Sequence, residues 1–530
     1  MMYAHAERMI AALDRAGARG LLHLGRKGLE KESLRIRRDG AIATSPHPEA
    51  WGSALTHPYL TTDYSEALAE LITPALTETP DVCEFLHAIH QFLYAHLTED
   101  ELLWCASMPC AAQDDRAIPL AEYGSSNLGR MKHVYRVGLD YRYGRRMQAI
   151  AGVHFNYSLP LDFWPLYQAL RADRRTQREF MDECYFALIR NFRRMGWLVP
   201  LLFGTSPALC SSFLAGRTTR FKPLDRCTHF LPYATSLRMS DIGYKNKNQA
   251  ALKISYDSLA QYVASLGRAI RTPYPEYEAI GLFDGGQRIQ LNSNVLQIEN
   301  EFYSFVRPKR TIRSGEKPSV ALRERGVEYV EMRALDVYPF EPTGVYDLQL
   351  RFLEAFLILC LLAESPPISP EEQAAIEYNE LTVALRGREP GLELLVGGGR
   401  RAALDWARDI VDAVLPICDM LDAGRADAAY VSAQRLQSET LADPERLPSA
   451  RLLAEMRASQ MPFSEYMSAL SRQHAGYFRT RPLDTARAAE FEKLAADSRA
   501  EQRAIEAADR LSFEEYLEAY FAERLPEASA

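Results

Sequence analysis

The chain has 530 residues, 47% of them hydrophobic and 25% charged, which is enough apolar material to bury the core of an ordinary globular protein. Its 62 basic and 70 acidic residues give a net charge of −8, so no overall basic surface favours nucleic acid as a partner. The most apolar run, residues 355–363, is nine residues long. That is far below the roughly 20 residues that span a bilayer, so no membrane segment is predicted.

The N-terminal segment predicts a short amphipathic helix over residues 3–18, with charges among its apolar positions. It lacks the apolar core of a signal peptide, so we expect a cytoplasmic location. The eight cysteines are scattered, and only Cys105 and Cys110 lie close together in the sequence. No second pair completes a zinc site, so we expect buried or idle thiols in a reducing compartment.

The middle of the chain mixes strands and helices. Strand-like runs alternate with helices such as 81–97 between residues 25 and 160, and 161–197 is predicted to be helical. Residues 270–340 are again strand-rich, with a hairpin turn expected at 284–286 between strands 279–283 and 288–295. Beyond Val345 the composition shifts to Ala, Leu, Glu and Arg, which predicts helices to the end. The expected organisation is one large unit, 1–345, with a helical region, 346–530, packed on it.

Four predicted strands carry acidic, amide or imidazole side chains at every second position, so that these side chains share one face of each strand. These residues are Glu30 and Glu32; His154, Asn156 and Ser158; Gln290, Asn292 and Asn294; and Tyr329, Glu331 and Arg333. A single polar face is common in antiparallel sheets, which often leave one side to solvent. These faces, however, hold hard oxygen ligands and fixed donors, which suit Mg²⁺ or Mn²⁺ better than bulk water. A sheet curved around them would form a cup for a polar, metal-bound ligand.

Two nucleotide-binding motifs are missing from the sequence. It has no G-x-x-x-x-G-K-[ST] loop and no G-x-G-x-x-G linked to a strand, while the glycines at 397–399 read as a loop. If a nucleotide binds, metals and arginines must therefore hold its phosphates.

Eight sequence runs resemble the glutamate–cysteine ligases of the proteobacterial type, within the glutamine-synthetase-like superfamily. They are GLEKESLRI (28–36), GSALTHPYLTTDYSEALAELITP (52–74), YGSSNLGRMKHVYRVGLDYRYG (123–144), GVHFNYSLP (152–160), FGTSPALCSSFL (203–214), LPYATSLRMSDIGY (231–244), LQIENEFYSFVRPKR (296–310) and VEYVEMRALD (327–336). The resemblance implies an α+β fold, in which a cup-shaped, mainly antiparallel sheet is backed by helices. It also makes residues 1–345 the catalytic unit.

The resemblance further implies the ligands and the residues that bind them. Two or three Mg²⁺ ions, or Mn²⁺ in their place, would lie between ATP and glutamate, held by Glu30, Glu32, Asp63, Glu70, His154 and Glu331. Arg238 would hold glutamate, Arg333 would face the transferred phosphate, and Tyr135, Arg136, Leu139, Tyr244 and Tyr303 would form the cysteine pocket. The implied reaction joins the γ-carboxylate of glutamate to the amino group of cysteine through a γ-glutamyl phosphate, in the first step of glutathione biosynthesis.

Three alternatives remain open from the sequence. The acceptor could be another small amine, or the enzyme could stop after phosphoryl transfer, as guanidino kinases of this superfamily do. A non-catalytic paralogue should have lost metal ligands, yet all six matched positions keep one. The expected partners are small molecules only, and the oligomeric state is not predicted.

Overall fold

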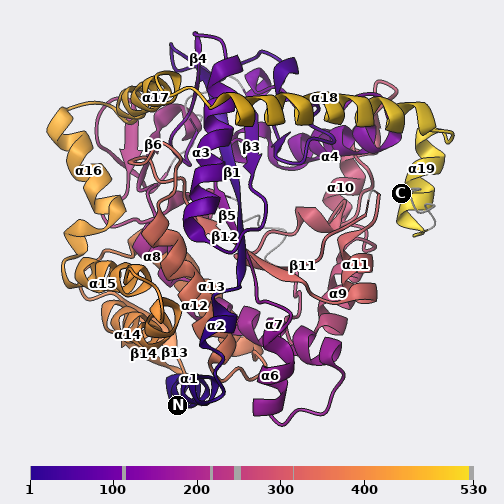
Figure 1. Cartoon of the computed structure of the whole chain (residues 1–530). Helices are drawn as coiled ribbons and strands as arrows, with labels where there is room; N and C mark the ends of the chain where they lie inside the picture. Colours follow the sequence, from indigo (N-terminus) through magenta and orange to yellow (C-terminus); the bar gives the residue numbers. More distant parts are fainter. Residues whose placement is uncertain (1, 110–114, 215–218, 244–251, 314, 524–530) are drawn as a thin grey trace.

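The computed structural model describes residues 2–109, 115–214, 219–243, 252–313 and 315–523 (Figure 1). At its centre lies a seven-stranded sheet in the order β11-β12-β5-β1-β3-β2, with β4 also paired to β1. Every pairing in this sheet is antiparallel. The strands are β1 (Arg26–Arg37), β2 (Leu60–Thr62), β3 (Leu68–Ile72), β4 (Glu101–Leu103), β5 (Val153–Ser158), β11 (Val306–Lys309) and β12 (Tyr329–Leu335).

Helices cover the back of this sheet. They include α3 (Thr79–His96), α7 (Gln177–Met195) and α12 (Asp347–Leu362), and α12 is buried along almost its whole length, as its apolar sequence predicts. Two lysines on the back of β1 contact them: Lys27 Nζ lies 2.7 Å from Glu354 on α12, and Lys31 Nζ lies 2.8 Å from His90 on α3. The expected α+β class, with an antiparallel sheet backed by helices, is confirmed.

Other elements lie around the sheet and on its front. They are α1 (Met2–Arg15), α2 (Arg19–Leu22), α4 (Asn127–Tyr143), α5 (Arg145–Gln148), α6 (Phe163–Leu170), α8 (Leu198–Phe203), α9 (Leu259–Ala269), α10 (Pro275–Ile280) and α11 (Pro318–Arg325), with a small sheet of β6 (Ala208–Cys210), β7 (Lys222–Pro223) and β8 (Thr228–Phe230). The expected helices at 3–18, 81–97 and 161–197 correspond to α1, to α3, and to α6 with α7.

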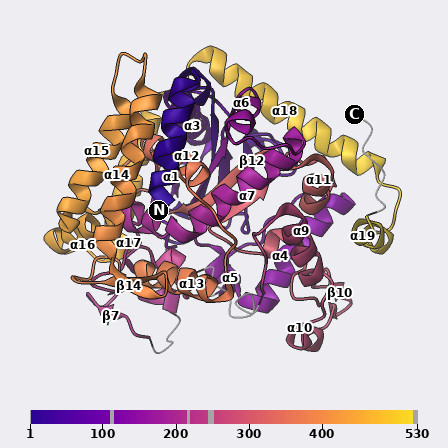
Figure 2. The same ribbon diagram turned by 90° about the horizontal axis from the view of Figure 1, so that it is seen from below.

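The C-terminal region is helical, as expected, apart from one hairpin among its described residues, formed by β13 (Glu393–Val396) and β14 (Gly399–Ala402). Of the three glycines expected to form a loop, Gly397 and Gly398 make its turn and Gly399 begins β14. Its later helices are α13 (Pro370–Arg386), α14 (Ala403–Asp422), α15 (Ala429–Ala442), α16 (Pro448–Ser459), α17 (Phe463–Arg479), α18 (Thr485–Ala508) and α19 (Phe513–Phe521). Both views show α18 running along one edge of the molecule before the chain turns into α19 (Figures 1 and 2). Residues of α19 pack against α4 in a small apolar cluster.

The expected strands around the 284–286 turn are largely wrong. The turn exists, but its strands are only β9 (Phe283–Asp284) and β10 (Gln287–Arg288), and residues 279–280 end helix α10. Residues 289–295 form no strand, so Gln290, Asn292 and Asn294 do not share a strand face. Their amide groups instead donate to backbone carbonyls of nearby loops and helix ends. The alternation of amide residues over this segment therefore arises from side chains that hydrogen-bond to the backbone of loops and helix ends, and not from a strand.

No helix among the described residues combines the length and the apolar character needed to cross a membrane.

Candidate active site

The front of the sheet gathers the predicted metal ligands through strand register. Glu30 on β1 lies opposite His154 on β5, and Glu32 lies opposite Glu70 on β3. Residues that are directly opposite in an antiparallel pair point to the same face. Glu331 on β12 is opposite Asn156 on β5, which places it on this face as well.

Three of these side chains converge on one point. One ligand atom each from Glu30, His154 and Glu331 lies within 4.8 Å of the others. His154 Nδ1 is 3.1 Å from Glu30 Oε2 and 3.7 Å from Glu331 Oε1. Among the described residues, no donor pairs with the buried Glu331 Oε2. A buried carboxylate oxygen is seldom left without a partner, so this oxygen fits a role as a cation ligand.

The negative charges of the carboxylates on this face repel one another. Burial and the neighbouring Asp63 raise the pKa of Glu32 to about 8. Burial, followed by the charges of Glu30, Asp63 and Glu32, raises the pKa of Glu70 well above its usual value. Burial and the nearby Arg333 lower the pKa of His154, which favours the neutral imidazole that can bind a metal. A bound cation would relieve the repulsion among these carboxylates.

Two cations flank Glu331. Arg333 Nη1 lies 3.0 Å and Lys309 Nζ 3.3 Å from the same oxygen, Glu331 Oε1. Burial alone would raise the pKa of Glu331, but Lys309 and Arg333 outweigh it and hold that pKa well below the usual value. Glu331 is therefore ionised beside two positive charges. The resemblance of the sequence assigns a role to Arg333, but it does not point to Lys309.

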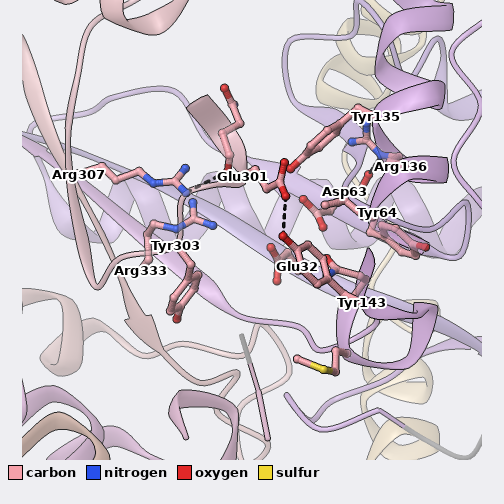
Figure 3. A pocket seen from close by; sticks show the side chains of 14 residues that line it. Glu32, Asp63, Tyr64, Tyr135, Arg136, Tyr143, Glu301, Tyr303, Arg307 and Arg333 are labelled. Carbon is pink, nitrogen blue, oxygen red and sulfur yellow. Dashed lines mark hydrogen bonds between the residues drawn. The ribbon is translucent and has the colours of Figure 1, made fainter. Parts of the chain in front are cut away.

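Next to this cluster is a cavity of about 110 Å³ (Figure 3). Seven of the predicted residues line it: Glu32, Asp63, Tyr135, Arg136, Leu139, Tyr303 and Arg333. Tyr135 and Leu139 lie four residues apart on α4, so they face the same way. Arg136 is held in place by the backbone, because its Nε donates to the carbonyl of Asp63 at 2.5 Å. The structure thus brings acidic, basic and aromatic side chains together around one small space.

Seven further residues line the cavity and were missed: Tyr64, Tyr143, Met147, Gln148, Asn300, Glu301 and Arg307. Tyr143 could have been found, because it continues the spacing of Tyr135 and Leu139 by another four residues. Its hydroxyl donates to Glu301 Oε1 at 2.7 Å, and the buried Arg142 lies 3.1 Å from the same oxygen. Glu301 is thereby fixed at the cavity wall by a tyrosine and an arginine from α4.

Arg238 does not line the cavity but contacts Arg333, which does. Its guanidinium is buried, with 1% of the side chain exposed, and Nη2 donates to the carbonyl of Arg333 at 3.0 Å. Its neighbour Met239 accepts the hydroxyl of Tyr303, with Oη and Sδ 3.2 Å apart. Arg238 is therefore one residue contact from the cavity. Tyr244 and Cys110 lie outside the described residues, and Cys105 is buried against α17.

An open antiparallel sheet that presents buried carboxylates, a histidine and arginines beside an aromatic cavity is suited to binding cations together with small anionic substrates, as an enzyme that acts on such substrates requires. Comparison with known proteins identifies the family. The family model described as glutamate-cysteine ligase matches residues 10–383. The chain belongs to the glutamate–cysteine ligase family and is an enzyme, which confirms the resemblance found in its sequence.

Individual relatives match over nearly their whole length. A glutamate–cysteine ligase of Alcanivorax borkumensis is 48% identical over 98% of this chain and 99% of the relative. One of Hahella chejuensis is 49% identical over 93% and 95%. The crystal structure of the Francisella tularensis glutamate–cysteine ligase in complex with AMP superposes with a TM-score of 0.89, at 35% identity, over 94% of this chain and 98% of that one.

Proposed function

We propose that this enzyme uses ATP to form γ-glutamylcysteine from L-glutamate and L-cysteine, with γ-glutamyl phosphate as the intermediate. One observation carries the proposal: carboxylates able to bind a metal lie beside a cavity lined by aromatic side chains and three arginines, in a chain of this family. AMP in the Francisella relative supports an adenine nucleotide as co-substrate.

The chemistry explains why ATP is needed. A carboxylate does not condense with an amine at neutral pH, because oxide is a poor leaving group. In the first step an oxygen of the γ-carboxylate attacks the γ-phosphorus of ATP, and the bond to the β-phosphate oxygen breaks to release ADP. In the second step the amine attacks the acyl carbon, loses a proton, and phosphate leaves.

The first step brings the glutamate carboxylate close to the phosphates of ATP, and cations bound at the front of the sheet would reduce the repulsion between these anions. The side chains that would hold two or three Mg²⁺ ions, or Mn²⁺, are Glu30, Glu32, Asp63, Glu70, His154 and Glu331. The bound cations would supply positive charge to the carboxylate and the phosphates. The unpartnered Glu331 Oε2 and the raised pKa values of Glu32 and Glu70 support this assignment.

Arg333 is the residue that we assign to the transferred phosphate. Its side chain lines the cavity, while its guanidinium touches Glu331 at the edge of the metal-ligand cluster. It can therefore contact a phosphoryl group that lies between the cluster and the cavity, where a guanidinium can neutralise the charge that develops.

The two amino-acid substrates would bind on either side of Tyr303. Arg238, which contacts the backbone of the cavity residue Arg333, would pair with a glutamate carboxylate. The acceptor cysteine would fit among Tyr135, Leu139 and Tyr303, with Arg136 beside them and Tyr244 assigned to the same pocket. Aromatic walls also keep water from the acyl phosphate, which would otherwise hydrolyse.

The direct test measures ADP release and γ-glutamylcysteine with the purified full chain, ATP, Mg²⁺ and glutamate, across a panel of amine acceptors. We expect cysteine to be preferred by a wide margin and Glu331→Gln to abolish the product without changing the circular dichroism spectrum. Glu328→Gln is the matched control, because Glu328 lies three residues away and 44% of its side chain is exposed. Normal turnover by Glu331→Gln at saturating Mg²⁺ would refute the metal assignment, and a preference for another amine would refute the acceptor.

A further inference from the structure

Lys309 is placed on the front of the sheet by strand register. It lies opposite Tyr329 in the β11–β12 pair, and Arg307 lies opposite Glu331. Lys309 and Arg307 therefore point to the same face as the metal-ligand cluster. The Lys309 side chain keeps 26% of its surface exposed, whereas that of Glu331 keeps 1%. The Lys309 side chain is therefore partly open to solvent, whereas Glu331 is not.

The backbone positions of Lys309 and Arg333 lie on opposite sides of Glu331, while their cationic groups both contact Glu331 Oε1. Along β12, Tyr329 and Arg333 lie two residues before and after Glu331, which is about 6.7 Å in each direction. Because Lys309 is beside Tyr329, it lies on the side of Glu331 that is remote from Arg333. Arg333 lines the cavity, whereas Lys309 is not among the described residues that do.

The in-line geometry of phosphoryl transfer indicates which way the leaving oxygen points in this site. Attacking and leaving oxygens lie roughly in line on opposite sides of the transferred phosphorus. In the proposed function the attacking carboxylate belongs to the glutamate held by Arg238, whose guanidinium contacts the backbone of Arg333, so it approaches from the side of Glu331 where Arg333 lies. The leaving oxygen, which is attached to the β-phosphate, must then point away from the cavity, past Glu331 and towards Lys309.

We propose that Lys309 binds the β-phosphate of the nucleotide and stabilises ADP as it leaves. This inference rests on the proposed function, because it takes the direction of transfer from it. Without nucleotide, Lys309 pairs with Glu331; the β-phosphate then provides a second anionic partner for an ammonium group that carries three donors.

A different role would also place Lys309 here: it could serve only to balance the charge of Glu331. The two roles predict different binding results for Lys309→Met. A β-phosphate contact predicts weaker MgADP binding. A counterion alone predicts unchanged or tighter MgADP binding, since removing the lysine frees Glu331 for a divalent cation.

The experiment titrates the full-length protein with MgADP and MgAMP by isothermal calorimetry, and with Mn²⁺ alone by electron paramagnetic resonance. For Lys309→Met we expect MgADP affinity to fall on the order of tenfold to hundredfold, the effect of one charged hydrogen bond. AMP affinity and Mn²⁺ affinity should not fall, and Lys309→Arg should recover most of the loss. Arg310→Met is the matched control, because the Arg310 guanidinium lies 3.5 Å from Glu328, away from the cluster.

Three results would overturn the inference: unchanged MgADP affinity in Lys309→Met, an equal loss for AMP, or a parallel loss of Mn²⁺ affinity. If the wild type itself neither binds MgADP nor forms γ-glutamylcysteine, the proposed function fails instead. The wild-type titration and assay therefore separate the two failures.

Discussion

Gly152→Ala should impair the use of glutamate and little else. Gly152 precedes β5, and a Cβ atom there would lie 2.0 Å from Arg238 Nη2 and 2.4 Å from its Cζ. Ordinary contact begins near 3.4 Å, so the guanidinium would have to move by about 1.4 Å, the difference between 3.4 and 2.0 Å. Arg238 is almost fully buried and closely packed, so it cannot move aside without leaving its present position.

The expected effect follows from the size of that shift. A displacement of about 1 Å in a group that positions a substrate can cost on the order of 10²-fold in rate. We therefore expect kcat/KM for glutamate to fall by about that factor, with the KM for cysteine nearly unchanged. The Gly152 amide donates to Glu32 Oε2 at 2.6 Å, and alanine keeps this N–H, so the metal ligands should stay in place.

Initial rates at varied glutamate, cysteine and ATP provide the measurement, and Mn²⁺ binding provides a check on the metal ligands. Gly28→Ala is the matched control on the same sheet, since a Cβ there would meet its nearest atom at 3.5 Å, an ordinary contact. Unchanged glutamate kinetics in Gly152→Ala, or a loss confined to cysteine, would refute the placement of Arg238 beside the glutamate site.

Three other changes test different parts of the structure. Leu517→Ala on α19 should raise the KM for cysteine several-fold in steady-state assays and leave the KM for glutamate unchanged. The reason is that α19 packs against α4 beside Tyr135, and the loss of a buried leucine costs about 2–5 kcal/mol locally. Burial lowers the pKa of His57 to about 4. Between pH 6.5 and 4 the unfolded chain therefore protonates this histidine while the folded chain does not, so the free energy of unfolding decreases as the pH drops below 6.5. In urea denaturation, the wild type should lose about 1.6 kcal/mol more than His57→Asn between pH 6.5 and 5; equal losses would contradict this. Cys105→Ser should keep near-normal activity with 2-aminobutyrate as acceptor, because burial raises the pKa of the Cys105 thiol to about 11 and leaves it unreactive. Complete loss of activity in a folded variant would reveal a functional thiol.

The metal-ligand face was predictable from sequence because its signal is local. Glu30 and Glu32 are two residues apart on a strand, and so are Glu331 and Arg333, so a period of two places each pair on one face. The same rule failed for residues 288–295. There the amides alternate in the same way, but they satisfy backbone carbonyls of a loop, a use that periodicity cannot distinguish from a strand face.

Other parts of the site depend on contacts that are remote in sequence. Lys309 joins the cluster only because β11 pairs with β12 in one particular register. Glu301 reaches the cavity wall because Arg142 and Tyr143 hold it from a helix more than 150 residues earlier. Neither contact leaves a pattern within a short window of sequence, so neither could be derived from periodicity or spacing.

Contacts on the back of β1 fix the position of the metal-ligand side chains on its front. Lys27 and Glu354 form an ion pair with both side chains at 1% exposure or less, and the hydroxyl of Tyr430 on α15 donates to the same carboxylate at 2.7 Å. Removing one member of such a pair leaves an uncompensated buried charge, at a cost of about 3–5 kcal/mol. The pair therefore opposes any slippage of β1, which would turn Glu30 and Glu32 away from the site. Glu354 and Tyr430 both lie beyond residue 345. We therefore propose that the helical C-terminal region fixes the strand on which the catalytic chemistry depends, although it supplies no residue to the cavity wall within the described chain.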